Sequence, residues 1–312
     1  MAVEITILVP LFDEQENLRP LHERLSAVLA DVGRPYEILF IDDGSRDDSF
    51  SVLEQLHGED REHVRVVRFR GNFGKSAALS AGFTEARGQI VFTMDADLQD
   101  DPEEIPAFLA KLDEGYDLVS GWKKVRHDPL GKTLPSKVFN WFTRVATGVP
   151  LHDFNCGFKC YRREVIEAID VYGEMHRFLP ALAAEYRFRV GEIPVKHHAR
   201  HAGKSKYGIE RFTRGAADLL TVLFLTRYFR RPAHLFGAAG FTFSGIGAAI
   251  LLYLTALWFM GMRPIGNRPL LMFGVLFVIM GIQFISLGLL GEMFTRISAG
   301  SRPGYSIRQR LE

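Results

Sequence analysis

Acidic side chains follow short apolar segments in the first hundred residues. Asp95, Asp97 and Gln99 come directly after the apolar run 89–94 and are spaced by two residues. In extended backbone this spacing puts the three side chains on one side, where their oxygen atoms can ligate one hard cation. Oxygen ligands suit Mg²⁺ or Mn²⁺ rather than zinc. The segment therefore predicts a divalent metal site, of the kind that is usually shared with a substrate diphosphate.

The alternative for this segment is a solvated acidic turn that caps a helix near Pro102, because a single Asp-x-Asp pair is common. Two other apolar runs favour the metal site. Asp42 and Asp43 follow one of them, and Phe12 and Glu14 follow the other. Stability gives no reason to gather acids at several strand ends, so we favour a bound cation.

A doubly wound α/β sheet would position these acids. Short β-rich runs at 5–10, 36–41, 64–69 and 90–94 alternate with helical stretches at 15–32, 49–56 and 76–86. Strands separated by helices of this length predict a mostly parallel sheet, and ligands bind such sheets beyond the carboxyl ends of the strands. The candidate site therefore comprises the segments 12–14, 42–45, 71–75 and 95–97.

The glycine-rich segment 71–75 is not a Walker phosphate loop, because Phe69 stands where that motif needs its first glycine. A G-x-G-x-x-G motif does not follow the first run either, which argues against a nicotinamide cofactor. Gly71 and Gly74 predict a tight turn or a close approach of the backbone to a ligand, with Lys75 available to an anion.

The composition excludes several classes of protein. The 312 residues are 47% hydrophobic and 24% charged, as in an ordinary globular chain. A net charge of +1 argues against a nucleic-acid partner. Two cysteines are too few for a disulfide framework or a four-thiolate zinc site.

The C-terminal part predicts a membrane hairpin. Residues 233–262 and 269–291 contain no Asp, Glu, Lys or Arg, and each run exceeds the roughly 20 residues that a spanning helix needs. Small residues in the first run favour packing of two helices in lipid over a pair of soluble core helices. Arginines gather before the first run and after the second, so the positive-inside rule places both termini in the cytoplasm.

The segments next to the hairpin complete the predicted organisation. No signal peptide is recognised at the start of the chain. Residues 209–231 interleave apolar and charged side chains, which favours an amphipathic helix in the headgroup layer, although a linker helix packed on the soluble domain is nearly as consistent. We expect four parts: a soluble domain at 1–208, a juxtamembrane helix at 209–232, a transmembrane hairpin at 233–295 and a cytoplasmic tail at 296–312.

The motifs at 10–17, 41–45, 72–75 and 95–99 resemble those of inverting glycosyltransferases of family 2, which have the GT-A nucleotide-sugar fold. More specifically, the chain resembles the polyprenyl-phosphate glycosyltransferases, a group that includes dolichyl-phosphate mannose synthases, bactoprenol glucosyltransferases and the undecaprenyl-phosphate aminoarabinose transferase. The resemblance covers almost the whole soluble domain and also the two C-terminal spans.

The resemblance implies a role for each matching residue. The nucleotide would contact Pro10, Phe12, Glu14, Asp43 and Lys75. The divalent ion, Mg²⁺ or Mn²⁺, would be held by Asp95, Asp97 and Gln99. Arg200 and Lys206 would clamp the diphosphate. Phe12 replaces a tyrosine that is common in the family, which keeps the aromatic ring but removes a hydroxyl.

The acceptor would be a polyprenyl phosphate. Its phosphate would be bound by Arg126, Lys132, Ser136 and Lys137. Lys132 stands where relatives often have arginine, so a bidentate phosphate contact is lost there. Asp153 occupies the place of the family's general base, but a phosphate dianion needs little deprotonation, so Asp153 would either act as base or orient nearby groups. Together with Asp95, Asp97 and Arg200 it completes the catalytic residues that the resemblance implies.

Some charged and polar residues have simpler interpretations. Lys123 and Lys124 are compatible with a solvated loop, the two cysteines with small apolar filling, and His197, His198 and His201 with surface charge near phosphates.

The resemblance thus implies a metal-dependent, membrane-anchored transferase that moves a sugar from a UDP- or GDP-linked donor to a polyprenyl phosphate. Together with the glycine-rich spans it also favours a homo-oligomer, with a tetramer as the form that the family suggests. A membrane-tethered nucleotide-sugar sensor without turnover is the alternative.

Overall fold

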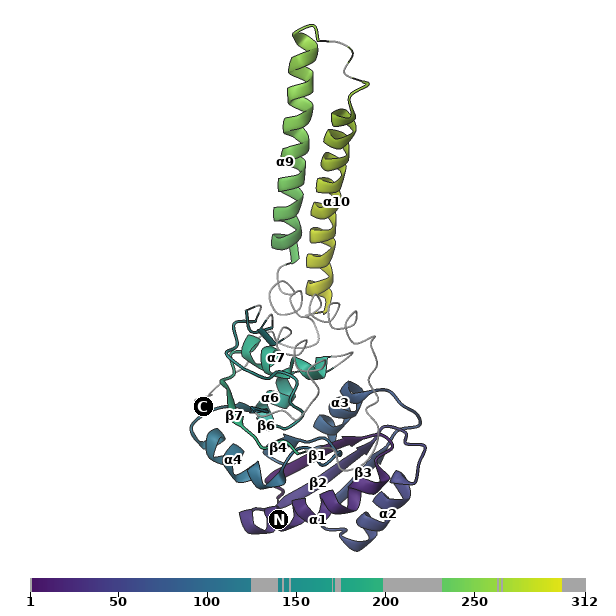
Figure 1. Ribbon diagram of the computed structural model, residues 1–312, viewed down its shortest axis with the longest axis vertical. Helices are drawn as coiled ribbons and strands as arrows, with labels where there is room; N and C mark the ends of the chain where they lie inside the picture. Colours follow the sequence, from purple (N-terminus) through teal and green to yellow (C-terminus); the bar gives the residue numbers. More distant parts are fainter. Residues whose placement is uncertain are drawn as a thin grey trace. The chain divides into compact units, whose positions relative to one another are not determined.

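The computed structural model describes residues 2–124, 140–141, 143–145, 147–169, 171, 175–198, 232–262, 264 and 266–298. These residues belong to two compact units, an α/β unit up to residue 198 and a helical unit from residue 232 (Figure 1). Residues 209–231 and 299–312, which carry the predicted amphipathic helix and most of the tail, lie outside the described residues. The predicted boundaries between the parts stay predictions.

The α/β unit is built on one seven-stranded sheet with the strand order β3-β2-β1-β4-β6-β5-β7. Its strands are β1 (Ile5–Leu11), β2 (Tyr36–Asp42), β3 (Val64–Arg68), β4 (Ile90–Thr93), β5 (Leu118–Trp122), β6 (Lys159–Arg162) and β7 (Val190–Pro194). The first four strands pair in parallel, and β7 pairs in parallel with β5. Only β6 runs antiparallel to its neighbours, β4 and β5. The prediction of a mostly parallel α/β sheet is confirmed.

Helices cover both faces of the sheet (Figure 1). One face packs against α1 (Gln15–Val32), α2 (Ser49–Glu59) and α4 (Ile105–Asp113), and the other against α3 (Lys75–Glu85), α6 (Arg163–Ala168) and α7 (Leu179–Glu185). The short 3-10 helices are η1 (Pro102–Glu104) and η2 (Met175–Arg177). All seven residues of β1 are buried, as expected for a central parallel strand with helices on both sides. The core therefore lies on both faces of the sheet.

The four strands and three helices that the sequence predicts before residue 95 are all present, with ends shifted by at most a few residues. The sequence analysis did not identify β5, β6 or β7. These strands have four or five residues, and β6 reads Lys-Cys-Tyr-Arg. A strand with a lysine and an arginine in four residues lacks the apolar run by which a buried strand is recognised.

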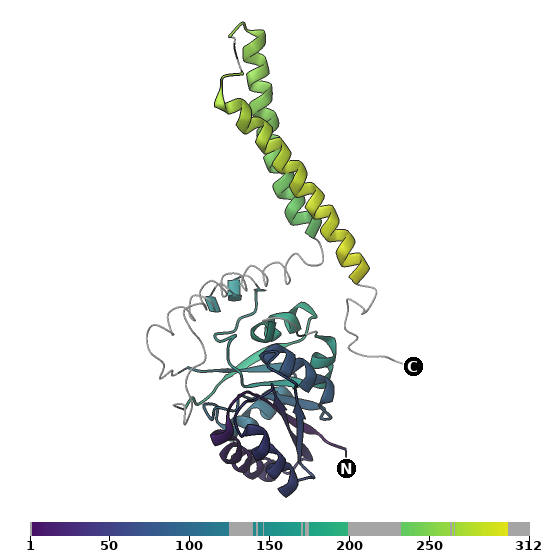
Figure 2. The same cartoon turned by 90° about the vertical axis from the view of Figure 1, so that its right-hand side faces the viewer.

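The helical unit consists of α9 (Pro232–Phe259) and α10 (Pro269–Ser298). The segments Ala233–Phe259 and Pro269–Phe294 are long and apolar enough to cross a membrane. The two helices lie side by side in both views (Figures 1 and 2). Glycines allow this close approach: a Cβ at Gly247 would lie 2.7 Å from the carbonyl oxygen of Gly274, and one at Gly281 would lie 2.6 Å from that of Gly240. The predicted pair of apolar helices is confirmed.

Candidate functional site

The loops after β1, β2 and β4 meet at one edge of the sheet, because parallel strands have their carboxyl ends on the same side. The acids after β2 hold these loops together. Asp42 Oδ1 accepts a hydrogen bond from the Ser45 backbone N–H at 2.8 Å. Asp43 accepts from the backbone N–H groups of Phe73 at 2.7 Å and Gly74 at 2.8 Å. The assumption that stability gives no reason for these acids is therefore wrong.

Asp43 joins the end of β2 to the loop that precedes α3. It is 4% exposed, and burial raises its pKa, although the two backbone hydrogen bonds act in the opposite direction. The neighbouring Gly44 has a φ of 73°, and a Cβ there would lie 2.5 Å from the carbonyl carbon of Gly71. Residue 44 must therefore be a glycine for the two loops to touch.

The loop after β1 is held against the loop after β2. The backbone N–H of Asp13 donates to Ser45 Oγ, and that of Glu14 donates to Ser49 Oγ, both at 2.9 Å. Glu14 Oε2 accepts from the Asn17 side-chain amide at 2.7 Å. Pro10 is buried next to Ile41 in the sheet register, and Phe12 and Glu14 are partly exposed. The structure thus brings together the predicted nucleotide residues of both loops.

The predicted metal ligands follow β4, but not in extended backbone. The strand ends at Thr93, residues 96 and 97 form a turn, and Leu98 has a φ of 58°. The argument that alternation puts Asp95, Asp97 and Gln99 on one side is therefore wrong, because the side-chain alternation of a strand is lost in a turn. Asp97 is 9% exposed, and its Oδ1 accepts a weak hydrogen bond from the Gln99 N–H at 3.3 Å.

The donor set of this turn still suits a hard cation, because it offers carboxylate and amide oxygens. Within the described ranges there is no group of three or more His, Cys, Asp and Glu residues arranged to hold a metal. A site here would have two carboxylates and would need further ligands from an amide, water or substrate. That is the usual arrangement for Mg²⁺ bound together with a phosphate.

Asp95 forms an ion pair with Lys75, the first residue of α3. Burial by itself would raise the pKa of the Asp95 carboxyl, but the Lys75 ammonium outweighs this effect and holds the pKa at about 2. A Cβ at Gly157 would lie 2.5 Å from Asp95 Oδ2. The carboxylate is therefore fixed between a lysine from α3 and a glycine that precedes β6, and it is ionised at neutral pH.

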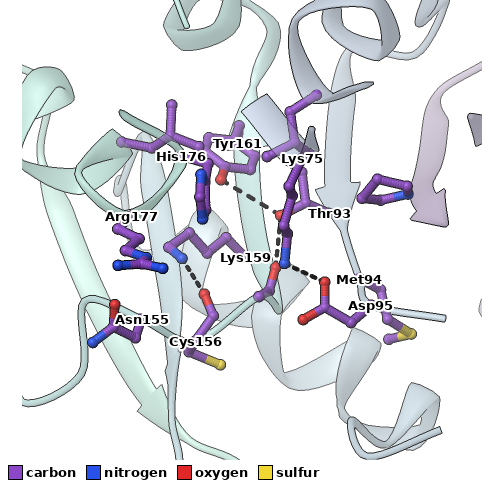
Figure 3. Close-up of a pocket in the computed structure, with 14 residues that line it drawn as sticks. Lys75, Thr93, Met94, Asp95, Asn155, Cys156, Lys159, Tyr161, His176 and Arg177 are labelled. Carbon is purple, nitrogen blue, oxygen red and sulfur yellow. Dashed lines mark hydrogen bonds and ion pairs between the residues drawn. The ribbon is translucent and has the colours of Figure 1, made fainter. Parts of the chain in front are cut away.

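A cavity of about 130 Å³ lies behind this ion pair (Figure 3). Pro10, Lys75 and Asp95 are predicted site residues that line it, and Met94, Asn155, Gly157, Lys159, His176 and Arg177 are among the other lining residues. Among the described lining residues, Lys75, Lys159 and Arg177 are basic and only Asp95 is acidic. Phosphate or carboxylate groups would meet favourable charge there. Sequence reasoning missed Asn155, Lys159, His176 and Arg177, since none of them follows a predicted strand.

Two basic groups of the cavity have unusual environments. Lys159 is 3% exposed, and its ammonium donates to the Cys156 carbonyl oxygen. Burial lowers the pKa of Lys159. His176 Nδ1 lies 2.9 Å from Ser76 Oγ. Burial, and then the nearby Lys75, lower the pKa of His176 to about 3, so the imidazole is neutral and can accept the Ser76 hydroxyl proton.

Lys123 is not on a solvated loop. Its ammonium lies 2.8 Å from Asp100 Oδ1, with the two side chains 15% and 0% exposed. Burial by itself would lower the pKa of Lys123, but the Asp100 carboxylate raises it above the ordinary value. His198 Nε2 lies 2.9 Å from Asp101 Oδ2, which identifies a partner for one of the predicted surface histidines. The acids after the metal turn therefore contact the residue that directly follows β5 and the segment after β7.

Asp153 is buried at 1% exposure, and its Oδ1 accepts from the Asn155 N–H at 3.1 Å. It is not among the described residues that line the cavity, whereas the following residues 155–157 are. The predicted residues Arg126, Lys132, Ser136, Lys137, Arg200 and Lys206, and also His201, lie outside the described residues.

Comparison with known proteins identifies the family. Glycosyl transferase family 2 matches residues 6–170. The chain is 40% identical over 314 residues to the dodecaprenyl-phosphate galacturonate synthase of Rhizobium johnstonii, with 99% of this chain and 93% of the relative covered. It is 37% identical over 309 residues to the undecaprenyl-phosphate 4-deoxy-4-formamido-L-arabinose transferase of Klebsiella pneumoniae subsp. pneumoniae, with 98% and 93% covered.

Among solved structures, the chain is similar to glucosyl-3-phosphoglycerate synthase from Mycobacterium tuberculosis in complex with Mn²⁺, UDP and phosphoglyceric acid. The TM-score is 0.53 at 18% identity, and the match covers 72% of this chain and 78% of that one. This likeness supports the fold. The chain belongs to glycosyltransferase family 2, as its motifs indicate.

Proposed function

We propose that this protein transfers a sugar, with inversion at the anomeric carbon, from a nucleotide sugar to the phosphate of a polyprenyl phosphate. One observation carries the proposal. Two relatives named for a polyprenyl-phosphate acceptor align at 40% and 37% identity over 99% and 98% of this chain. The alignment therefore includes both the α/β unit and the two apolar helices.

The nucleotide would bind in the loops after β1 and β2, with the Phe12 ring near the base and Asp43 near the ribose. Asp43 already accepts two backbone hydrogen bonds, but each carboxylate oxygen has a second lone pair for a ligand hydroxyl. The diphosphate would then extend toward Lys75 and Asp95, where Arg200 and Lys206 would add positive charge. On this path the sugar would lie at the cavity that Asp95 lines.

Asp95, Asp97 and Gln99 would hold Mg²⁺ or Mn²⁺ against the diphosphate. When bound, the ion would stabilise the negative charge that develops on the leaving nucleoside diphosphate. The related fold that was crystallised with Mn²⁺ and UDP supports this role. Lys75 pairs with Asp95, so its ammonium would also lie close to the phosphates of a diphosphate bound at this carboxylate.

The acceptor phosphate needs orientation more than activation. A phosphate monoester has a second pKa of about 6 and is largely dianionic near neutral pH. Its oxygen would attack the anomeric carbon from the face opposite the leaving diphosphate, while Arg126, Lys132, Ser136 and Lys137 hold the remaining oxygens. Asp153 would serve mainly to orient nearby groups, and its carboxylate raises the pKa of the buried Lys159 against the larger, opposite effect of burial.

The charge of the cavity favours an anionic sugar. Among the described lining residues, Lys75, Lys159 and Arg177 are basic, and Asp95 is the one acid. A carboxylate on the sugar would gain attraction there, whereas a neutral or cationic sugar would not. A uronate donor is therefore our first candidate, and the relative named for galacturonate supports it.

The two apolar helices would cross the membrane with the α/β unit on the cytoplasmic side. Arginines gather before the first helix and after the second, and this charge bias is typical of cytoplasmic segments. Anchoring suits the reaction, because a polyprenyl acceptor stays in the bilayer. We also propose a homo-oligomer.

The test is incubation of the purified full-length protein with polyprenyl phosphate and a panel of nucleotide sugars, with lipid products identified by mass spectrometry. The panel should include galacturonate and 4-deoxy-4-formamido-L-arabinose donors. We expect a polyprenyl phosphosugar that disappears on addition of EDTA. Tight binding of a nucleotide sugar without any lipid product would favour the sensor instead.

A further inference from the structure

Helix α10 presents two different faces. Gly274, Gly281 and Gly288 are spaced by seven residues and are buried, and a Cβ at Gly281 would lie 2.1 Å from Ser244 Oγ of α9. These glycines therefore mark the face that packs on α9. Gln283 follows Gly281 by two residues, which turns its side chain about 200° around the helix. Gln283 is exposed on the opposite face.

The exposed face forms a regular seam. Its residues alternate in steps of three and four along the helix and are all exposed: Met272, Leu276, Ile279, Gln283, Ser286, Leu290 and Met293. This spacing is compatible with the a/d pattern of a helix that packs against another helix. The neighbouring row at 272, 275, 279, 282, 286, 289 and 293 is equally exposed, so it is the polar Gln283 that singles out this seam. Gln283 and Ser286 are the two polar members of the seam, near its middle.

The amide of Gln283 lacks a hydrogen-bond partner within the part of the chain that the structure describes. It lies 14 residues after Pro269 and 11 before Phe294, the ends of the candidate span. At 1.5 Å per residue these ends are about 21 Å and 17 Å away along the helix. A glutamine side chain is too short to reach either headgroup layer, and hydrocarbon offers no hydrogen bonds. The amide therefore needs a protein partner.

We propose that this seam is the contact between copies of this chain, with α10 of one copy packed in parallel against α10 of another and Gln283 hydrogen-bonded to its counterpart. All copies have the same orientation in the membrane, so identical helices meet in parallel, and an in-register contact pairs each residue with itself. A glutamine amide contains both a donor and an acceptor, so it is complementary to itself. The inference rests on the proposed membrane placement of α10.

The test uses the full-length protein in membranes. Gln283→Cys and the control Ile282→Cys place a thiol at nearly the same depth but about 100° apart around the helix. Native Cys156 and Cys160 are buried. After oxidation with copper phenanthroline, covalent dimers are measured on non-reducing gels. We expect at least about tenfold more dimer from Gln283→Cys, since interhelical contact holds the two thiols together. Equal yields, or no dimer from either variant, would overturn the seam.

A second measurement does not depend on the added cysteine. Gln283→Leu should weaken self-association in lipid vesicles about three- to thirtyfold, as for loss of an interhelical polar contact, and Gln283→Asn should retain most of it. Unchanged association in Gln283→Leu would contradict the proposal. Release of the wild-type protein by alkaline carbonate would overturn the membrane placement and this inference with it. The sugar-transfer assay on wild-type protein tests the proposed function separately.

Discussion

The two halves of the sheet use charged residues in different ways. In the parallel half, β3-β2-β1-β4, acids at and just after the strand ends accept backbone hydrogen bonds, as Asp42 and Asp43 do, and the buried Glu37 of β2 pairs with Arg65 of β3. In the other half, β6-β5-β7, buried lysines lie on or directly after the strands. Lys159 of β6 is 3% exposed. Lys123, which directly follows β5, pairs with the buried Asp100.

The contrast separates two reasons for charge at this site. A loop carboxylate that accepts backbone N–H groups stabilises the fold and shapes the nucleotide loops at the same time. A buried ammonium is costly, and a well-packed apolar residue often replaces a buried ion pair without loss of stability. The lysine in the cavity wall is therefore better explained by catalysis or binding than by folding.

The largest effect on turnover is expected at Asp95, which follows β4, the strand of the parallel half that pairs with β6. Asp95→Asn removes the carboxylate that pairs with Lys75 and would ligate the ion on the diphosphate. We expect turnover to fall by about 10²–10³-fold, as for loss of a group that stabilises charge in the transition state. The measurement is the rate of formation of the lipid product, with thermal unfolding as the folding control. Retention of a tenth or more of the activity would exclude this role.

In the parallel half, Asp43→Ala should mainly destabilise the fold. The N–H groups of Phe73 and Gly74 lose their acceptor, and we expect the free energy of unfolding to fall by about 2–4 kcal/mol. The measurement is urea unfolding of the detergent-solubilised protein. Asp43→Asn keeps the geometry and should lose less. A variant with unchanged stability and impaired nucleotide binding would place Asp43 in the ligand site alone.

In the other half, Lys159→Met should mainly lower turnover and leave the stability of the fold nearly unchanged. Methionine fills a similar volume without a charge, so we expect stability to change by no more than about 1–2 kcal/mol. Turnover should fall about ten- to a hundredfold, because charge-assisted contacts to an anion contribute about 1.5–3 kcal/mol. Kinetics with a uronate and a neutral donor give a further comparison. If the free energy of unfolding fell by more than the activation free energy of turnover rose, the two halves would not differ in the way described.

The smallest effect concerns pH. The pKa of His176 is about 3 in the folded protein, against about 6.5 in an unfolded chain. The unfolded state therefore binds the extra proton between these values, and stability is lost as pH falls from about 6.5 toward 3. At pH 5 this group should cost about 1–2 kcal/mol relative to pH 8. His176→Gln should remove that part of the decline in unfolding midpoint. An identical decline in both proteins would show that His176 is not responsible.

The sequence by itself determined the parallel half, the pair of apolar helices and the family. These features depend on local patterns: apolar runs of four to seven residues, polar residues directly after them, and long segments without charge. Such patterns specify an element and its end wherever the rest of the chain lies. Pro10, Phe12, Glu14 and Asp43, for which the family resemblance implies nucleotide contacts, lie at or just after the ends of such runs.

Only the tertiary structure decided what faces Asp95. Ser76 and His176 are 100 residues apart in sequence, yet their side chains are 2.9 Å apart. Lys159 lies in a charged four-residue strand that resembles an exposed loop, yet it is buried and lines a cavity together with residues of α3, η2 and α7. The turn at 95–99 likewise depends on a left-handed Leu98, which residue spacing does not reveal. Burial and backbone conformation result from contacts between distant segments, so periodicity cannot predict them.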